Sequence, residues 1–590
     1  MDELIEYSAY VAILLALAIP LSSYINRVME GNFGVKSRIL APIEHGAFRL
    51  LGIKADEGMG WRRYLVAVLA FSAISFVVLM AILMLQGILP LNPEGFDGLS
   101  WHLAFNTAAS FVTNTNWQSY SGESTLSYFS QAIGLTVENF VTPAVGMAVL
   151  FALFRGLVRE ESSNLGNFFA DVVRALLFVL LPFALVISLV DVWQGSPQTL
   201  DDYETVQLVE PVGIDAEGNV VDADSEEAVD VVTEGVVPLG PQSSQVAIKQ
   251  IGTNGGGFNG VNSASPLENP TPLSNLIQCI SLLLIPFSLA LSFGRYVNDR
   301  RQGRAIFSVF AIFLIAGIFC VGFAEMAGTP QLAANGEVYM GTVGQSGGNM
   351  EGKESRFGVT DSALWATFTS AASNGAVNSM HDSYTPLGGM IPIILMALGE
   401  IIGGGVGCGL YSMIGFVILT VFIAGLMVGR TPEYLGKKIG PKEMRMAVVL
   451  SMTTPCIALV GAAVLCIDPA TVDSLTNSGA HGFSEVLYAA VSCAGNNGSA
   501  FAGLNANTPM INTVLGLEML ANRFIPIVAT LCLAGSLASR KRVAASAGTL
   551  STCNVMFVVL LIIVILIVGA LSMFPALALG PVAEHFQMVL

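Results

Sequence analysis

The chain contains little charge. Asp, Glu, Lys and Arg make up only 12% of its 590 residues, whereas hydrophobic residues make up 53% and the mean hydropathy is +0.67. Soluble domains carry about 25% charged residues, so this composition excludes an ordinary soluble domain and indicates a polytopic membrane protein. We expect membrane lipid as its surroundings and no nucleic-acid partner.

Signals for disulfides, zinc and catalysis are also missing. The eight cysteines form no CxxC pair and no Cys/His spacing typical of zinc sites, so packed thiols are expected. No HExxH motif occurs, and the acids Glu138, Glu325, Glu400 and Glu518 are scattered over different apolar stretches. A membrane-embedded enzyme is therefore disfavoured, and no catalytic site is expected in this chain.

Long hydrophobic runs, in contrast, are abundant. A helix needs about 20 apolar residues to cross a bilayer core of about 30 Å, and ten stretches reach that length. They lie at about 6–26, 64–88, 129–154, 172–194, 272–294, 305–327, 387–428, 446–467, 510–538 and 552–578. The seventh is too long for one crossing and is interrupted by GGGVGCG at 403–409. The first begins MDELIEY, with acids where a signal peptide has bases, so we expect a retained helix.

Lysine and arginine are unevenly divided among the connecting loops. With the N-terminus outside, 22 of the 26 basic residues fall in inner loops, Lys249, Lys353 and Arg356 fall outside, and Arg523 lies within a span. Loops rich in lysine and arginine face the cytoplasm. This pattern predicts a multi-pass topology with both termini outside.

The longest outer segment, at about 195–248, is strongly acidic. Residues 201–234 hold twelve acids and no base. We expect a solvated outer loop there. A vestibule that concentrates cations is the alternative.

Four short polar runs recur along the chain. They are VTNTNWQ at 112–118, GTNGGGFNG at 252–260, ASNGAVN at 372–378 and CAGNNGS at 493–499. Their central asparagines, Asn114, Asn254, Asn374 and Asn496, are 140, 120 and 122 residues apart. A period near 120, stretched once by the acidic segment, indicates copies of one unit.

The apolar runs just before these loops, such as 103–111 and 364–372, are too short to span, so short pore helices are expected. Irregular backbone at membrane depth is tolerated only inside protein or beside a water-filled cavity, so the four runs should meet around one axis. Glycine and asparagine allow backbone carbonyls to turn inward, as binding of a dehydrated monovalent cation requires. Because the runs contain no acid, potassium is favoured over a divalent ion.

The predicted fold is an all-α polytopic membrane protein with ten transmembrane helices. Four membrane–pore–membrane repeats surround a central pore, and one helix flanks them at each end. The predicted parts are 1–63, the first helix and inner loop; 64–171, repeat 1; 172–304, repeat 2 with its insert; 305–445, repeat 3; 446–543, repeat 4; and 544–590, the last helix and an outer tail.

Six motifs together resemble the family of potassium-binding A subunits (KdpA) of bacterial Kdp potassium-transporting ATPases. They are TNTNWQSYSGE (113–123), GTNGGGFN (252–259), GNMEGKESRFG (348–358), SAASNGAVNSMHDS (370–383), GRTPEYLGKKI (429–439) and SCAGNNGSAFAGL (492–504). The resemblance extends over nearly the whole chain and is weakest in the acidic insert. It implies a multi-pass protein of the bacterial plasma membrane with no cofactor and with potassium as its transported ion.

The resemblance also implies a potassium filter and a barrier. The filter residues would be Asn114, Thr115 and Asn116; Thr253, Asn254 and Gly255; Ser373, Asn374 and Gly375; and Cys493, Ala494 and Gly495, where the fourth run can slide by one residue. Gln118 would support the first run or act at the pore mouth. Gly403, Gly404 and Gly405 would form a gate or a close helix contact, and Arg523 a barrier below the filter or a structural ligand of helix-end carbonyls.

By the same resemblance, the chain would select extracellular potassium and pass it to a P-type ATPase of the same complex. Its implied partners are that P-type ATPase (the B subunit), a single-span C subunit and a small F subunit. The chain lacks the DKTGT phosphorylation motif of such an ATPase, so it would be a non-catalytic subunit. The alternative is a stand-alone, channel-like or sodium-coupled potassium transporter of the same superfamily.

Overall fold

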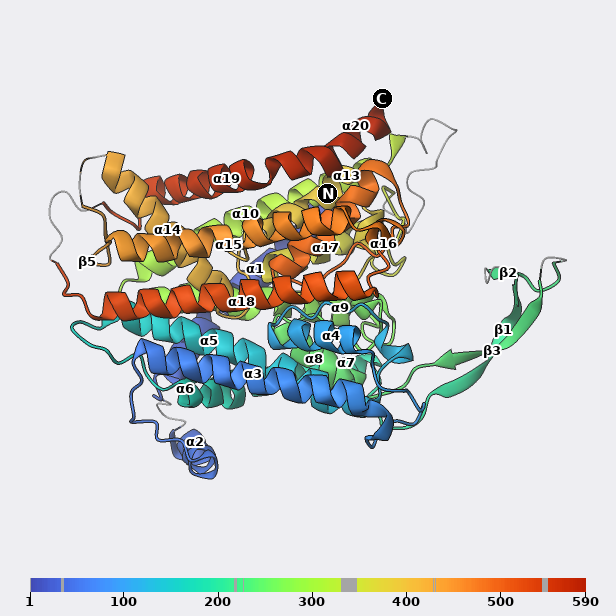
Figure 1. The fold of residues 1–590 in the computed structure, drawn as a ribbon, viewed down its shortest axis with the longest axis horizontal. Helices are drawn as coiled ribbons and strands as arrows, with labels where there is room; N and C mark the ends of the chain where they lie inside the picture. Colours follow the sequence, from blue (N-terminus) through green and yellow to red (C-terminus); the bar gives the residue numbers. More distant parts are fainter. Residues whose placement is uncertain are drawn as a thin grey trace.

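The computed structural model describes residues 2–32, 37–216, 220–225, 228–330, 347–427, 429, 431–543 and 550–590. Long helices run side by side in one elongated bundle, and a β arm projects from one end of it (Figure 1). We call this end the arm end. The opposite end, which carries helix α2 (Ser37–Leu51) and the hairpin of β4 (Glu433–Tyr434) and β5 (Lys437–Lys438), is the basic end.

Ten helices within the described residues are long and apolar enough to cross a membrane, which confirms the predicted number. They are α1 (Asp2–Met29), α3 (Trp61–Leu85), α5 (Thr136–Val158) with the π-helical turn before it, α6 (Phe168–Arg174) running into α7 (Leu181–Gln194), α9 (Pro272–Tyr296), α10 (Arg300–Ala327), α14 (Cys408–Met427), α15 (Pro441–Cys466), α18 (Pro509–Ala538) and α19 (Val555–Leu577) running into α20 (Ala583–Val589).

Burial separates central helices from peripheral ones. In α5 and α9, 89% and 83% of the most apolar window is buried, against 17% in the α3 span and 22% in the span of α19 and α20. A helix that is apolar all round lies either inside a protein or in lipid. Helices α5 and α9 therefore form the inside of the bundle, and α3 and α19 leave most of their surface for lipid.

Four shorter helices, each followed by a loop, lie between spanning helices. They are α4 (Trp101–Val112), α8 (Gln242–Ile251), α12 (Gly358–Ala372) and α17 (Gly479–Ala494). The runs predicted as pore helices, 103–111 and 364–372, fall inside α4 and α12, so this prediction is confirmed. Each unit is thus a spanning helix, a short helix, a loop and a second spanning helix.

The seventh span is interrupted, as predicted. It consists of α13 (Pro386–Ala397) and α14, joined by residues 398–407 without helical structure. Gly399, Glu400, Gly403, Gly404 and Gly407 have φ between 59° and 90°, a left-handed conformation that helical residues do not adopt. The interruption begins five residues before the glycine run, and Cys408 already belongs to α14.

Two segments outside the spanning helices differ from the prediction. The acidic insert is not an irregular loop, because β1 (Glu204–Ile214), β2 (Val220–Asp222) and β3 (Asp230–Val237) form an antiparallel sheet in the order β2-β1-β3 (Figure 1). Its many valines favour strands, a signal that the acid count concealed. The expected C-terminal tail is helical as far as Val589. Both chain ends lie in the half of the bundle nearer the arm (Figure 1).

Lys437 joins two central helices at the basic end. It lies in the hairpin of β4 (Glu433–Tyr434) and β5 (Lys437–Lys438), and its side chain is fully buried. Its ammonium donates to the carbonyl oxygens of Gly156 at 3.1 Å and Leu537 at 2.6 Å, and also to Arg159. Gly156 and Leu537 lie in the last turns of α5 and α18, and Arg159 is the C-cap of α5. Lys437 therefore joins the ends of two helices, where carbonyls lack the full set of intrahelical partners.

We expect Lys437→Met to destabilise the protein by about 2–3 kcal/mol, because it leaves buried carbonyls without their charged donor. The neighbouring Lys438 is exposed, so Lys438→Met should change stability by less than about 0.5 kcal/mol. Thermal unfolding in detergent measures both. Equal melting temperatures for the two variants would contradict this role of Lys437.

Candidate ion-binding site

The loop after each short helix has the same backbone conformation. The amide nitrogens of Thr115, Asn254, Asn374 and Asn497 each donate to the carbonyl five residues earlier, at 2.9, 2.8, 3.0 and 2.9 Å. The residue before each has positive φ: 66° at Asn114, 52° at Thr253 and Ser373, and 50° at Asn496. Residues 114–116, 253–255, 373–375 and 496–498 are therefore equivalent, and we call them the loop triplets.

The predicted fourth triplet is displaced. Cys493 and Ala494 lie inside α17, and Gly495 is its C-cap. The equivalent residues are Asn496, Asn497 and Gly498, three positions later than predicted. The other three triplets lie where the sequence placed them, although Asn114 is equivalent to Thr253 and not to Asn254.

The four loop triplets close into a ring. The first loop bonds to the second, the second to the third, and the fourth to the first, whereas the fourth loop reaches the third unit through Thr369 of α12. The bonds are Asn114 Nδ2 to Thr253 O at 2.7 Å, Asn254 Nδ2 to Asn114 Oδ1 at 2.6 Å, Gly375 N to Asn254 O at 2.8 Å, Asn497 Nδ2 to Thr369 O at 3.0 Å, and Asn496 Nδ2 to Thr115 Oγ1 at 2.8 Å.

Glycine permits this closure. A Cβ at Gly255, where φ is 132°, would overlap the backbone nitrogen of Gly375. A Cβ at Gly498 would overlap the carbonyl oxygen of Thr115, and one at Gly375 would lie 2.7 Å from the Gly498 carbonyl carbon. Adjacent loops therefore touch backbone to backbone, and a side chain at these positions would force them apart.

The third residues of the triplets keep free carbonyl oxygens. Within the described residues, the carbonyls of Asn116, Gly255, Gly375 and Gly498 accept no hydrogen bond. A carbonyl inside a protein is nearly always paired with protein or water, so these oxygens are available to water or to an ion. Oxygens of neutral groups are ligands for a weakly hydrated cation.

A cavity of about 400 Å³ lies against the ring. Its wall includes Asn116, Gly375 and Gly498, and also Gln118. The Gln118 amide makes two hydrogen bonds to the backbone of one residue: Nε2 donates to Gly257 O at 3.1 Å, and Oε1 accepts from Gly257 N at 3.0 Å. Gln118 therefore clamps the first loop to the second and also faces the cavity.

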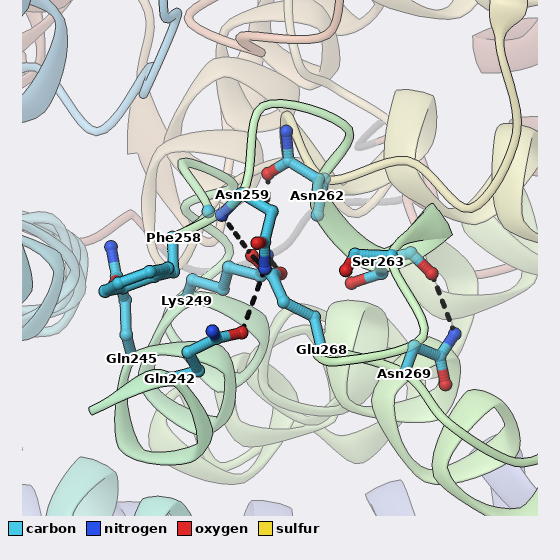
Figure 2. Close-up of polar contacts among 12 residues, drawn as sticks. Gln242, Gln245, Lys249, Phe258, Asn259, Asn262, Ser263, Glu268 and Asn269 are labelled. Carbon is cyan, nitrogen blue, oxygen red and sulfur yellow. Dashed lines mark hydrogen bonds and ion pairs between the residues drawn. The ribbon is translucent and has the colours of Figure 1, made fainter. Parts of the chain in front are cut away.

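A buried ion pair supports the second loop. Figure 2 shows Lys249, from α8, and Glu268 reaching toward each other within a cluster of amides. Both side chains are fully buried, and Glu268 also accepts from the backbone nitrogen of Asn259 at 2.8 Å. Lys353 and Glu325 form a second fully buried pair, at 2.7 Å, in the third unit. Removing one partner of such a pair costs about 3–5 kcal/mol.

The interruption of the seventh span lies against the other side of the ring. Val406 N donates to Thr253 Oγ1 at 2.9 Å, and Gly404 N donates to Ala371 O at 2.8 Å. A Cβ at Gly405 would lie 3.5 Å from Thr253 Oγ1. The predicted gate residues Gly403, Gly404 and Gly405 therefore pack directly beneath the loop triplets.

Arg523 lies close to this interruption. Its side chain, on α18, is 3% exposed and interacts electrostatically with Glu400, Cys408 and Tyr411. The neighbouring Asn522 donates to Asn496 Oδ1 at 3.3 Å. The structure thus brings Arg523, the glycine run and the loop triplets together.

The family can now be stated. Residues 8–586 match the family model that is described as "Potassium-transporting ATPase A subunit" (KdpA). The chain belongs to this family. Similar chains named potassium-transporting ATPase potassium-binding subunit occur in Clostridium botulinum, 59% identical over 100% of both chains, and in Listeria monocytogenes, 53% identical over 98% of both. The potassium transporter TrkH from Vibrio parahaemolyticus aligns at 14% identity over 88% of this chain and 97% of its own, with a TM-score of 0.48.

Several residues of the site in this KdpA-family chain were missed from the sequence. Asn497 and Gly498 were not predicted, because the predicted fourth triplet begins three residues before the equivalent position in the structure. Thr142 on α5, which donates to Asn114 Oδ1 at 2.7 Å, carries no local signal. Lys249 and Glu268 stand in a polar stretch of the sequence, where isolated charges give no sign of a buried pair.

We expect Gly255→Ala to lower the stability of this KdpA-family protein by more than about 3 kcal/mol, because backbone strain and steric overlap combine. Gly95 is the matched control. Its φ is 69°, and a Cβ there meets no atom within 4 Å, so Gly95→Ala should cost only about 1 kcal/mol of strain. Thermal unfolding in detergent compares the two, and equal losses would contradict ring closure through Gly255.

Proposed function

We propose that this KdpA-family chain is the potassium-selective subunit of an ATP-driven potassium uptake pump, with the loop triplets as its filter. The observation that carries the proposal is the ring of four triplets whose third residues have carbonyl oxygens that accept no hydrogen bond from any described residue. Such oxygens replace the water shell of a dehydrated monovalent cation. The triplets contain only Asn, Thr, Ser and Gly, and this neutral ring suits potassium better than a strongly hydrated divalent ion.

The distribution of basic residues supports an outward-facing arm end. Basic residues gather at the basic end: Arg62 and Arg63 lie in the first turn of α3, and Lys437 and Lys438 lie in the β4–β5 hairpin. This end would face the cytoplasm. Both termini, the acidic arm and the cavity of about 400 Å³ then lie outside, in a bacterial plasma membrane. The cavity is the external entrance to the filter in this orientation.

The segment beneath the ring supports a block to straight passage. Residues 398–407 pack against Thr253 and Ala371, and Arg523 adds a buried positive charge close by. A buried arginine in a membrane repels a potassium ion, because little water screens it. The ion would leave the filter sideways, and Gly403, Gly404 and Gly405 would provide the movable part.

The energy would come from a partner. The chain has no DKTGT phosphorylation motif, and the relatives are named as potassium-binding subunits of a potassium-transporting ATPase. The partners we propose are a P-type ATPase as the B subunit, a single-span C subunit and a small F subunit. This chain would contribute binding and selection of potassium and no catalytic group.

The direct test is potassium-stimulated ATP hydrolysis in detergent, for this chain alone and for the chain co-expressed with those three partners. We expect activity only in the complex, lost in Gly255→Asp and retained in the control Gly95→Asp. Passive potassium flux from liposomes that contain this chain alone, without activity in the complex, would identify a stand-alone transporter instead.

Gln118 tests the electrostatics of the cavity. We expect Gln118→Arg to weaken potassium affinity about thirtyfold, since a unit charge about 8 Å from the ion costs about 2 kcal/mol at an effective dielectric of about 20. The potassium concentration for half-maximal ATP hydrolysis by the complex measures this.

Gln118→Glu is the matched variant, because it keeps the acceptor for Gly257 N and reverses the sign of the charge. Its affinity should be unchanged or tighter. If both variants weaken potassium binding equally, Gln118 acts only by clamping the second loop.

A further inference from the structure

A second cluster of ligand-type side chains lies at the arm end, apart from the loop triplets. Asp382 follows the third loop, in η7 (His381–Ser383), and His481 and Glu485 lie four residues apart on α17. One ligand atom from each lies within 4.8 Å of the other two. Asp382 and Glu485 are 8% and 0% exposed, so this is not a group of solvated surface acids.

The His481 ring is fixed in orientation. Nδ1 lies 2.7 Å from Glu584 Oε1 of α20, while Nε2 lies 3.1 Å from Asp382 Oδ1 and 3.9 Å from Glu485 Oε1. The ring stacks on Phe501 with an interplanar angle of 15°. A histidine that donates one ring nitrogen to a carboxylate and turns the other toward further ligands is the usual arrangement at metal sites.

The cluster has an excess of negative charge. Three carboxylates surround one imidazole, and within the described residues no lysine or arginine forms an ion pair with any of them. Glu485 Oε1 accepts from Asn477 at 2.8 Å, but Oε2 is buried and has no described partner.

We propose that Asp382, His481 and Glu485 bind a divalent transition-metal cation of the Zn²⁺ type, with Glu584 as the orienting carboxylate. One imidazole nitrogen and two carboxylate oxygens form a ligand set that Zn²⁺ accepts and that leaves a fourth position for water. The site is distinct from the loop triplets, which contain no acid or histidine.

The bound ion would connect three segments near the cavity. Met380 and His381, which line the cavity, directly precede Asp382. A Cβ at Gly503, five residues after the fourth triplet, would lie 2.8 Å from Asp382 Oδ2 and would overlap Glu485 Oε1. Metal binding would therefore brace the segments that follow the third and fourth loops against α17 and α20.

Isothermal titration of ZnCl₂ into the purified full-length chain in detergent tests the proposal, with MgCl₂ as the comparison. We expect one saturable Zn²⁺ per chain, and affinity at least tenfold lower in His481→Gln and in Glu485→Gln. The controls are His45→Gln, at an exposed histidine of α2, and Cys320→Ser, at an exposed thiol. Both controls should bind as the unmodified chain does.

Glu584→Gln separates ligation from a merely structural effect, because it keeps all three proposed ligands and alters only the orienting carboxylate. Its affinity for Zn²⁺ should fall about tenfold or more, while its elution volume and its melting temperature without metal stay near those of the unmodified chain. Two results would overturn the proposal: no saturable binding by the unmodified chain, or unchanged binding in both His481→Gln and Glu485→Gln. His481 would then be an ion-paired imidazolium only.

Discussion

Close contact of four loops at the centre of the bundle is the constraint on which the rest of the structure depends. Irregular backbone inside a membrane protein must find partners for its amides and carbonyls within the protein. Here each loop supplies partners to its neighbour, as Asn254 O does for Gly375 N. Among the described residues, the third position is the one at which all four triplets keep a carbonyl that accepts no hydrogen bond. The packing of the four loops therefore also leaves oxygens available to an ion.

Different kinds of contact support the four loops of the ring. The second loop is supported by the buried pair Lys249–Glu268, whereas the neutral amide of Gln118 joins the first loop to the second. In the third unit the buried pair Lys353–Glu325 bonds instead to Thr385, where α13 begins. Among the described residues, the third unit is also the one whose second spanning helix is interrupted directly beneath the ring. This unequal arrangement is what a sideways exit for the ion would require, since a fourfold-equivalent pore would favour straight passage.

Much of this fold could be predicted from the sequence, because spans, short helices and glycine runs are local signals. Apolar length predicted the ten helices, and the run at 403–409 predicted the break in the seventh. The register of the fourth loop could not be predicted, because it depends on where α17 ends, which is seen only in the bond from Asn497 N to Ser492 O. CAGNNG permits several registers, whereas GTNGGG in the second loop permits few.

Other features depend on contacts between distant segments. No local pattern shows that Asn114 meets Thr142, or that Lys437 reaches the ends of α5 and α18. The β arm was not predicted, for a different reason. Its acids indicated a solvated segment, whereas its valines favour strands. An exposed sheet accounts for both the acids and the valines.

Anomalous diffraction from crystals of the complex grown with Tl⁺ in place of K⁺ tests the central claim most directly. The account predicts an anomalous peak inside the ring of residues 114–116, 253–255, 373–375 and 496–498, displaced by added K⁺ but not by Na⁺. Ordered Tl⁺ elsewhere on the protein with an empty ring, or a ring peak that Na⁺ displaces as readily as K⁺, would contradict it.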